Sequence, residues 1–309
     1  MLPTLIDKPF DDDGWLFEIK WDGIRAIGVV GGRGSSTLIS RNRLSLNQKF
    51  PELAGLDEQF TRVPLVIDGE IVSLDAHGRS SFQRLQRRSK NDGGEGGHIV
   101  YSVFDLLYDG RHDLRQRPLD ERKAALEKLI KPRARLVMYS KHVIGKGKQL
   151  FAVARRRKLE GIVGKRRDST YQERRSRDWV KIKAHLEQEF VIGGYTDPQG
   201  SREAFGALLV GVYEGGNLVF CGGVGTGFDT QMLREIMRTM RPLVSRSCPF
   251  AMPPPPPIAK TAHWLKPKLV AEVRFAEWTA EGLLRQPVFL GLRTDKDAKD
   301  VVRERPVER

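Results

Sequence analysis

The chain has 309 residues, 39% of them hydrophobic, so it can bury the cores of two domains and wholesale disorder is excluded. Its formal net charge of +14 predicts a polyanionic partner such as nucleic acid. Two cysteines outside any CxxC pair and six scattered histidines argue against a disulfide framework and a Cys/His metal site, and no apolar run is long enough to span a membrane.

The first predicted element is a strand that leads into Lys20-Trp21-Asp22-Gly23. Alternation divides it into two faces, one with Leu16, Glu18 and Lys20 and the other with Phe17, Ile19 and Trp21. We expect the bulky apolar set to pack into a core, which leaves a carboxylate and an amine on the remaining face. A lysine held on a strand beside a tight turn and Arg25 suits covalent catalysis by an amine. An edge strand with a solvated lysine is the alternative interpretation.

Strands and helices alternate irregularly up to residue 130. The predicted strands span 37–40, 65–72 and 99–107, and the predicted helices span 50–60, 80–89 and 119–130. Between the second helix and the third strand, residues 91–97 form a Gly-rich stretch without the Lys-Ser or Lys-Thr ending of a P-loop. We interpret this stretch as a flexible connector.

A further helix is predicted over 148–159, and its end carries Arg155-Arg156-Arg157-Lys158. We favour a solvated face for this basic run over a phosphate contact. Strands at 162–163 and 179–183 follow, and short Gly-punctuated strands beyond residue 183 are typical of a small barrel. Asp229 is expected to cap one more helix. Pro253–Pro257 is not taken as a domain boundary, because too few residues follow to form a separate core.

Five clusters follow Lys20 in a set order: Ser40-Arg41-Asn42, Asp68-Gly69-Glu70, Phe104-Asp105, Glu160-Gly161-Ile162-Val163 and Lys181-Ile182-Lys183. With the KxDG pattern in front, this order resembles the covalent nucleotidyltransferase superfamily, which includes ATP-dependent DNA ligases and mRNA capping enzymes. The far end is similar to the closing segment of bacterial end-joining DNA ligases of the LigD type, in His263–Pro267, Phe275–Thr279 and Leu284–Lys296. The resemblance covers nearly the whole chain.

This resemblance implies an α+β fold. An adenylation (nucleotidyltransferase) domain of antiparallel sheets with flanking helices is expected over residues 1–186, and a β-barrel OB-fold domain over 187–309. The implied activity is sealing of nicks or broken DNA ends through a lysyl-AMP intermediate and a DNA-adenylate. An RNA ligase, a GTP-using capping enzyme and a non-catalytic OB-type nucleic-acid binder are the alternatives.

The resemblance also implies roles for single residues. Lys20 is the nucleophile and Phe104 stacks on adenine. The remaining nucleotide contacts fall to Glu18, Arg25, Arg41, Glu70, Lys181 and Lys183, and to Arg293 and Lys296 of an RxDK-like motif. Glu160 is the first choice as ligand for Mg²⁺ or Mn²⁺, with Glu70 as the second. Because an amine attacks phosphorus only when it is neutral, we expect Arg25, Lys181 and Lys183 to lower the pKa of Lys20.

The implied partners are nicked or broken double-stranded DNA, Ku, and end-joining polymerase and phosphoesterase modules. The resemblance fits a free-standing ligase and a module of a larger enzyme equally. We expect a monomer without membrane attachment. The first residues lack the basic and apolar regions of a signal peptide, so the expected location is the bacterial cytoplasm, at the nucleoid. Arg43 stands where this family often has glycine.

Overall fold

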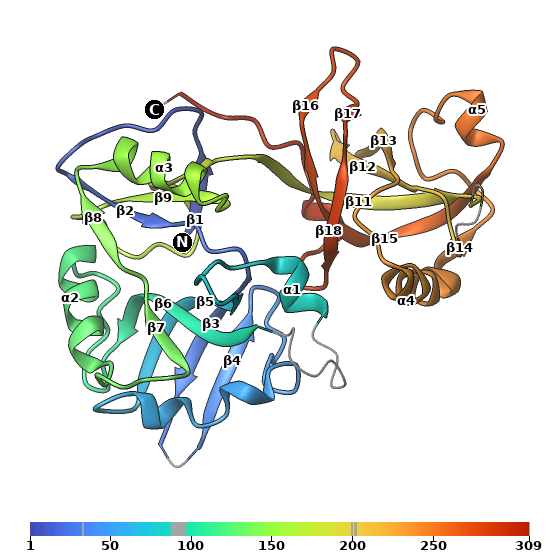
Figure 1. The fold of residues 1–309 in the computed structure, drawn as a ribbon. Coiled ribbons are helices and arrows are strands. Elements are labelled where there is room, and N and C mark those ends of the chain that lie inside the picture. Colours follow the sequence, from blue (N-terminus) through green and yellow to red (C-terminus); the bar gives the residue numbers. More distant parts are fainter. Residues whose placement is uncertain (33, 88–96, 199, 201–202, 309) are drawn as a thin grey trace. The chain divides into compact units, whose positions relative to one another are not determined.

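The structure is a computed structural model that describes residues 1–309 except 33, 88–96, 199, 201–202 and 309 (Figure 1). The chain forms two compact units, Met1–Ala184 with Arg305–Arg309 and His185–Glu304. The backbone N–H of Val307 donates to the carbonyl of Leu5 at 3.0 Å, which ties the last residues to unit 1. The connector expected over 91–97 lies, up to residue 96, outside the described residues.

The first sheet of unit 1 contains the strand with the KxDG pattern. Its strand order is β1 (Leu2–Leu5), β10 (Arg175–Lys183), β9 (Gly161–Arg166), β2 (Trp15–Ile19) and β8 (His142–Ile144). All pairings are antiparallel except that of β1 with β10, which is parallel. Helix α3 (Gly147–Arg156) packs on β2 and β9, as the ribbon in Figure 1 shows.

The second sheet of unit 1 has the order β4 (Ser36–Ser40), β3 (Ile24–Val30), β5 (Leu65–Leu74), β6 (His98–Tyr108) and β7 (Val137–Tyr139). Strands β6 and β7 are parallel, so neither sheet is purely antiparallel as expected. Helix α2 (Leu119–Leu129) packs on β6 and α1 (Phe82–Arg87) on β5. Two 3₁₀ turns, η1 (Pro51–Leu53) and η2 (Leu56–Gln59), replace the single helix expected at 50–60, because Gly55 between them has a left-handed φ of 82°.

Strand β2 is buried on both faces, which corrects the prediction that one face would remain free. Phe17 packs with Ala154 and Leu159 in one core cluster. Leu16 packs in a second cluster with Phe104 and Trp179, which come from strands of both sheets. Trp21 was expected in the core, but it is half-buried and its indole Nε1 donates to Ser140 Oγ at 3.2 Å.

Unit 2 is built on one larger sheet of order β13 (Asn217–Val224), β12 (Leu208–Glu214), β11 (Leu186–Thr196), β15 (Ala262–Phe275) and β14 (Val244–Ser245), with β18 (Val288–Arg293) also paired to β15. A hairpin joins β16 (Glu277–Trp278) to β17 (Leu284–Arg285). The helices are α4 (Thr230–Met240) and α5 (Pro256–Ala259), with 3₁₀ turns η3 (Arg241–Leu243) and η4 (Ala298–Asp300). Asp229 caps α4 as predicted and accepts the Met232 N–H at 2.7 Å.

The α+β class is confirmed, but the expected closed barrel is wrong in detail. In the described part of unit 2 the strand pairings leave the sheet open. The segment after β13 meets β18 through a single isolated bridge between Thr226 and Val288, which is not a ladder. The architecture is consistent with an OB-type domain whose sheet curves without full closure. Within the described residues, no helix combines the length and the apolarity that a membrane crossing requires.

Candidate active site

Lys20 follows the last residue of β2 and is held by both its backbone and its side chain. Its N–H donates to the Gly161 carbonyl at 3.0 Å, and its Nζ donates to the Glu160 carboxylate. Burial lowers the pKa of Lys20, but the Glu160 carboxylate outweighs burial and, with Glu70 and Asp22, holds the pKa above its ordinary value. The predicted lowering of this pKa is therefore wrong for the present arrangement, because the charges that act on Lys20 are carboxylates.

Gly161 lets three chain segments converge beside Lys20. Its φ is 151°, and a Cβ placed on it would lie 2.1 Å from the carbonyl oxygen of Ile182. In the pairing of β9 with β10, Gly161 stands opposite Lys183, and the Ala184 N–H donates to the Glu160 carbonyl at 2.8 Å. The backbone thus brings Lys20, Glu160 and Lys183 together. Lys181 lies one alternation along, so both β10 lysines point to the same face of the strand.

Arg25 is engaged away from Lys20. It stands opposite Glu70 in the pairing of β3 with β5, and its guanidinium donates to both oxygens of Asp68, at 3.0 and 2.5 Å. Burial raises the pKa of Asp68, but the Arg25 charge more than offsets burial and the pKa lies below its usual value. Tyr171 also donates to Asp68, at 2.7 Å. This buried carboxylate compensates the charge of Arg25, and Arg25 is not among the main influences on the pKa of Lys20.

Glu18 does not share an open face with Lys20. One of its carboxylate oxygens lies 2.7 Å from Lys123 Nζ and 3.1 Å from Lys165 Nζ, and the other accepts from Ser140 Oγ at 2.8 Å. Burial raises the pKa of Glu18, but the two ammonium groups outweigh burial and lower it overall. Both oxygens of Glu18 are therefore occupied inside unit 1.

Lys165 is a buried lysine that the sequence reasoning missed. Its Nζ lies 4.2 Å from the ring centroid of Phe104 and 4.2 Å from that of Trp179. Burial is the main reason that its pKa falls to about 8. The neighbouring Lys123 lowers this pKa further, while Glu18 raises it. The lysine fixes the packing of the ring expected to stack on adenine. Its signal in the sequence was weak, because Lys165 is followed by Arg166 and Arg167 and looks like the start of an exposed basic stretch.

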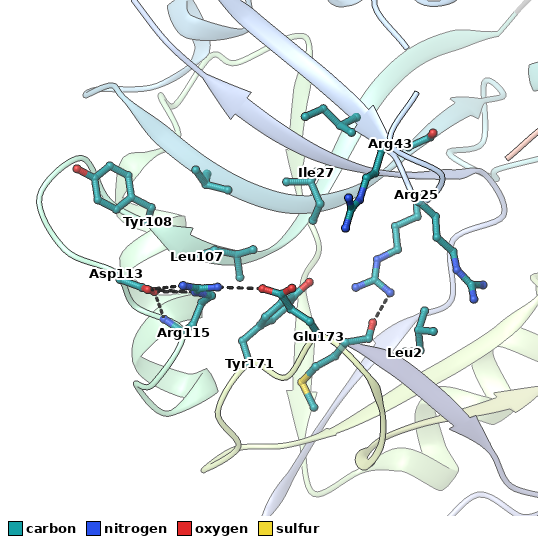
Figure 2. Close-up of a pocket in the computed structure, with 15 residues that line it drawn as sticks. Leu2, Arg25, Ile27, Arg43, Leu107, Tyr108, Asp113, Arg115, Tyr171 and Glu173 are labelled. Atoms are coloured by element: carbon teal, nitrogen blue, oxygen red, sulfur yellow. Dashed lines mark hydrogen bonds and ion pairs between the residues drawn. The ribbon is translucent and has the colours of Figure 1, made fainter. Parts of the chain in front are cut away.

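Arg25 and Arg41 line a cavity of about 690 Å³ in unit 1. Figure 2 shows Arg25 and Arg43 above Leu2 and Tyr171, and it shows Arg115 between two carboxylates. Those carboxylates, Asp113 and Glu173, lie 2.7 and 2.9 Å from the Arg115 guanidinium. Lys20 and Glu160 are not among the lining residues. Arg43 adopts a left-handed φ of 60°. Glycine adopts this conformation without strain, which accounts for the glycine that related sequences often have at this position.

In unit 2, carboxylates hold the two cations of the RxDK-like motif. Arg293 donates to both oxygens of Asp295, at 2.9 and 2.7 Å, and reaches Glu272 at 3.4 Å. Lys296 lies 2.9 Å from Glu189. The structure thus brings Arg293 and Lys296 together within unit 2, while the other predicted site residues belong to unit 1.

The carboxylates around Lys20 are oxygen donors of the kind that Mg²⁺ and Mn²⁺ accept. Glu160, Glu70 and Asp22 all act on its ammonium group. Across the described residues, no group of three or more His, Cys, Asp or Glu side chains is arranged to hold a metal by itself. A Mg²⁺ ion that is shared with a nucleotide phosphate needs only one or two protein carboxylates. The donor set therefore fits a metal that is bound together with a nucleotide.

Known proteins match both units. Residues 4–183 match the family model described as the ATP dependent DNA ligase domain, and residues 201–296 match the ATP dependent DNA ligase C terminal region. The multifunctional non-homologous end joining protein LigD of Pseudomonas aeruginosa is 40% identical over 313 residues, which are 99% of this chain and 36% of that protein. LigD of Mycobacterium tuberculosis is 42% identical over 293 residues, which are 94% of this chain and 37% of that protein.

A solved structure of mycobacterial DNA ligase D complexed with ATP and MES is 36% identical, covers 98% of both chains and has a TM-score of 0.71. The chain spans little more than a third of the length of the two LigD relatives, at 36% and 37%. These matches do not favour a capping enzyme, an RNA ligase or a non-catalytic binder. From the family model that covers residues 4–183 and from these relatives, the chain belongs to the ATP-dependent DNA ligases, in their LigD-like branch.

Proposed function

We propose that this chain seals nicks or broken ends in double-stranded DNA by three nucleotidyl transfers. Lys20 Nζ attacks the α-phosphorus of ATP, a P–N bond forms, and pyrophosphate leaves. The AMP then passes to the 5′-phosphate of the break, which frees Lys20. Finally the 3′-hydroxyl attacks that phosphate, loses its proton and displaces AMP. The observation that supports this proposal is the placement of Lys20 against Glu160, Gly161 and the strand that carries Lys181 and Lys183.

The other residues of unit 1 would bind and orient the nucleotide. Lys181 and Lys183 share one face of β10 and would stabilise the charge that grows on the α-phosphate. Phe104 would stack on adenine, with Lys165 and Glu18 holding its ring in place from within the protein. Arg25 and Arg41 would contact ribose or phosphates from the cavity that they line, and Glu70 would contact the ribose.

Glu160 would be the first ligand of a divalent metal, with Glu70 as the second. Mg²⁺ or Mn²⁺, when bound, supplies positive charge to the phosphate oxygens. An ion that engaged Glu160 would also compete with the Glu160–Lys20 pair. From unit 2, Arg293 and Lys296 would orient the departing pyrophosphate.

DNA is the proposed substrate because the chain is strongly basic and belongs to the DNA ligases. The names of the LigD relatives support a role in non-homologous end joining, and such a role would take place at the bacterial nucleoid. Ku and the polymerase and phosphoesterase modules of end joining are the proposed partners.

Incubation with α-labelled nucleotides tests this proposal. The chain, with Mg²⁺ or Mn²⁺, should become covalently labelled by ATP and not by GTP, and the label should stay with the protein on a denaturing gel. Addition of nicked duplex should discharge the label and yield a sealed strand. Labelling that prefers GTP would place the chain among capping enzymes. Absence of labelling by either nucleotide would favour a binding module.

A further inference from the structure

The end of α3 carries four consecutive basic residues, Arg155, Arg156, Arg157 and Lys158, which we call the basic tail. The helix closes with a double hydrogen-bonded cap. The Leu159 N–H donates to the Ala154 carbonyl at 2.9 Å, and the Lys158 N–H donates to the Arg155 carbonyl at 3.0 Å. Lys158 supplies the left-handed residue of this cap, with a φ of 56°. Glycine would adopt this conformation with less strain, so the lysine is present at a cost to the backbone.

The charges of the basic tail are uncompensated, unlike those of several other exposed arginines of unit 1. All four side chains are exposed, and in the described part of the chain no hydrogen bond or ion pair joins any of them to an acidic group. By contrast, Arg166 lies 2.8 Å from Asp168 and Arg115 lies 2.7 Å from Asp113. A run of free cations on a rigid element gathers anions from solution.

The core of unit 1 holds the two residues that flank the tail, and Glu160, the partner of Lys20, follows the tail closely in the chain. Ala154 and Leu159, on either side of the tail, are buried in the cluster that contains Phe17 of β2. The next residue after Leu159 is Glu160, whose side chain pairs with Lys20. The tail is therefore fixed to the same β2–β9 framework as Lys20, and only a few residues separate it from the site of chemistry.

We propose, in place of the solvated face favoured from the sequence, that the basic tail binds the phosphate backbone of duplex DNA next to the break, an inference that rests on the proposed ligase function. Successive residues of a helix point about 100° apart, so Arg155 and Arg156 cannot converge on one phosphate group, and Arg157 and Lys158 lie beyond the end of the helix. They can reach several phosphates along an extended strand. A single nucleotide triphosphate is too compact to occupy all four, whereas duplex DNA presents a continuous row of charges.

The test compares binding of nicked duplex DNA over a range of salt for the whole chain and two variants. Lys158→Gly removes one charge and relieves the strained backbone, so it should unfold at the same or a higher temperature while its DNA affinity falls. The triple change Arg155→Gln, Arg156→Gln and Arg157→Gln should weaken binding further. Each lost phosphate contact should reduce the slope of log affinity against log salt by about 0.9, roughly a threefold change between about 50 and 200 mM salt. Lys128→Gln, at the exposed end of α2 on the other sheet, is the matched control and should bind like the unchanged chain.

The result separates failure of the inference from failure of the function. If the unchanged chain neither binds nicked DNA nor takes label from ATP, the proposed function is wrong. If it does both and the tail variants keep its affinity and salt slope, the inference is overturned. A loss of ATP labelling without a loss of DNA affinity would also overturn it, because the tail would then serve the triphosphate.

Discussion

Lys20 and Lys165 lie on neighbouring strand segments, each beside a glutamate, yet their pKa values move in opposite directions. Lys20, with 21% of its side chain exposed, faces the carboxylates of Glu160, Glu70 and Asp22, and its pKa rises. Lys165 is 3% exposed and shares the single carboxylate of Glu18 with Lys123, so its pKa falls to about 8. Burial lowers the pKa of both lysines, and the pKa rises only at Lys20, where several carboxylates together outweigh burial.

The largest effect should come from removal of the reactive amine. Lys20→Ala should abolish covalent labelling by ATP, and Lys20→Arg should do the same, because a guanidinium stays protonated and cannot attack phosphorus. Denaturing gels with α-labelled ATP measure this step. Both variants should still seal a pre-adenylylated nick to some degree, since that step takes AMP from DNA. Normal ATP-dependent sealing by Lys20→Ala would show that the wrong lysine has been assigned.

The second effect concerns stability. Here the carboxylate beside Lys165 should matter more than the carboxylate beside Lys20. Glu18→Gln leaves the buried ammonium groups of Lys123 and Lys165 without their carboxylate, so it should lower the free energy of unfolding by about 3–5 kcal/mol. Glu160→Gln should cost only about 1 kcal/mol, because Lys20 can be hydrated where it is exposed. Urea denaturation of both variants measures the difference. Equal losses would mean that the two sites are equally buried in solution.

The smallest effect is a pH dependence that arises from Lys165. The folded chain releases the Lys165 proton near pH 8, whereas the unfolded chain releases it near the ordinary value of 10.5. Between these values the unfolded state binds more protons, so this lysine makes stability rise with pH. The free energy of unfolding of the unchanged chain, relative to Lys165→Met, should increase by about 1–2 kcal/mol from about pH 7 to about pH 9.5. A difference that stays constant would show that Lys165 keeps its proton throughout this range.

Much of the fold follows from local sequence patterns. Helices α2 and α4 were predicted from apolar periodicity and a capping Asp229. The strand that leads to Lys20 and the strands that carry Glu70 and Lys181 were predicted as well. The open sheet of unit 2 and the parallel pairings of β1 and β7 were not predicted. Pairing partners far apart in the chain leave no local signal, so topology cannot be derived from spacing alone.

The sequence predicted which residues belong to the candidate site better than it predicted the charges that surround them. Motif order indicated Lys20, Glu160 and Lys183, and the structure places these three around Gly161. The pairing of Arg25 with Asp68 and the occupation of Glu18 by two lysines could not be predicted. Lys123 lies on a helix whose charged residues look solvated in sequence, and only the packing of α2 on β6 buries it against Glu18. The error over the pKa of Lys20 follows from its pairing with Glu160, which motif order does not reveal.

Gly161 limits which sequences can carry this site. Any side chain at this position would run into the backbone of β10 at Ile182, so β9 and β10 would separate and carry Lys183 away from Lys20. The adjoining residues meet no such barrier, because Ile162 and Val163 point their side chains away from the strand plane. If a library with all twenty amino acids at position 161 is selected for ligation, only glycine should be recovered. In directed evolution of this chain, improved variants should therefore keep Gly161 and carry their substitutions at other positions.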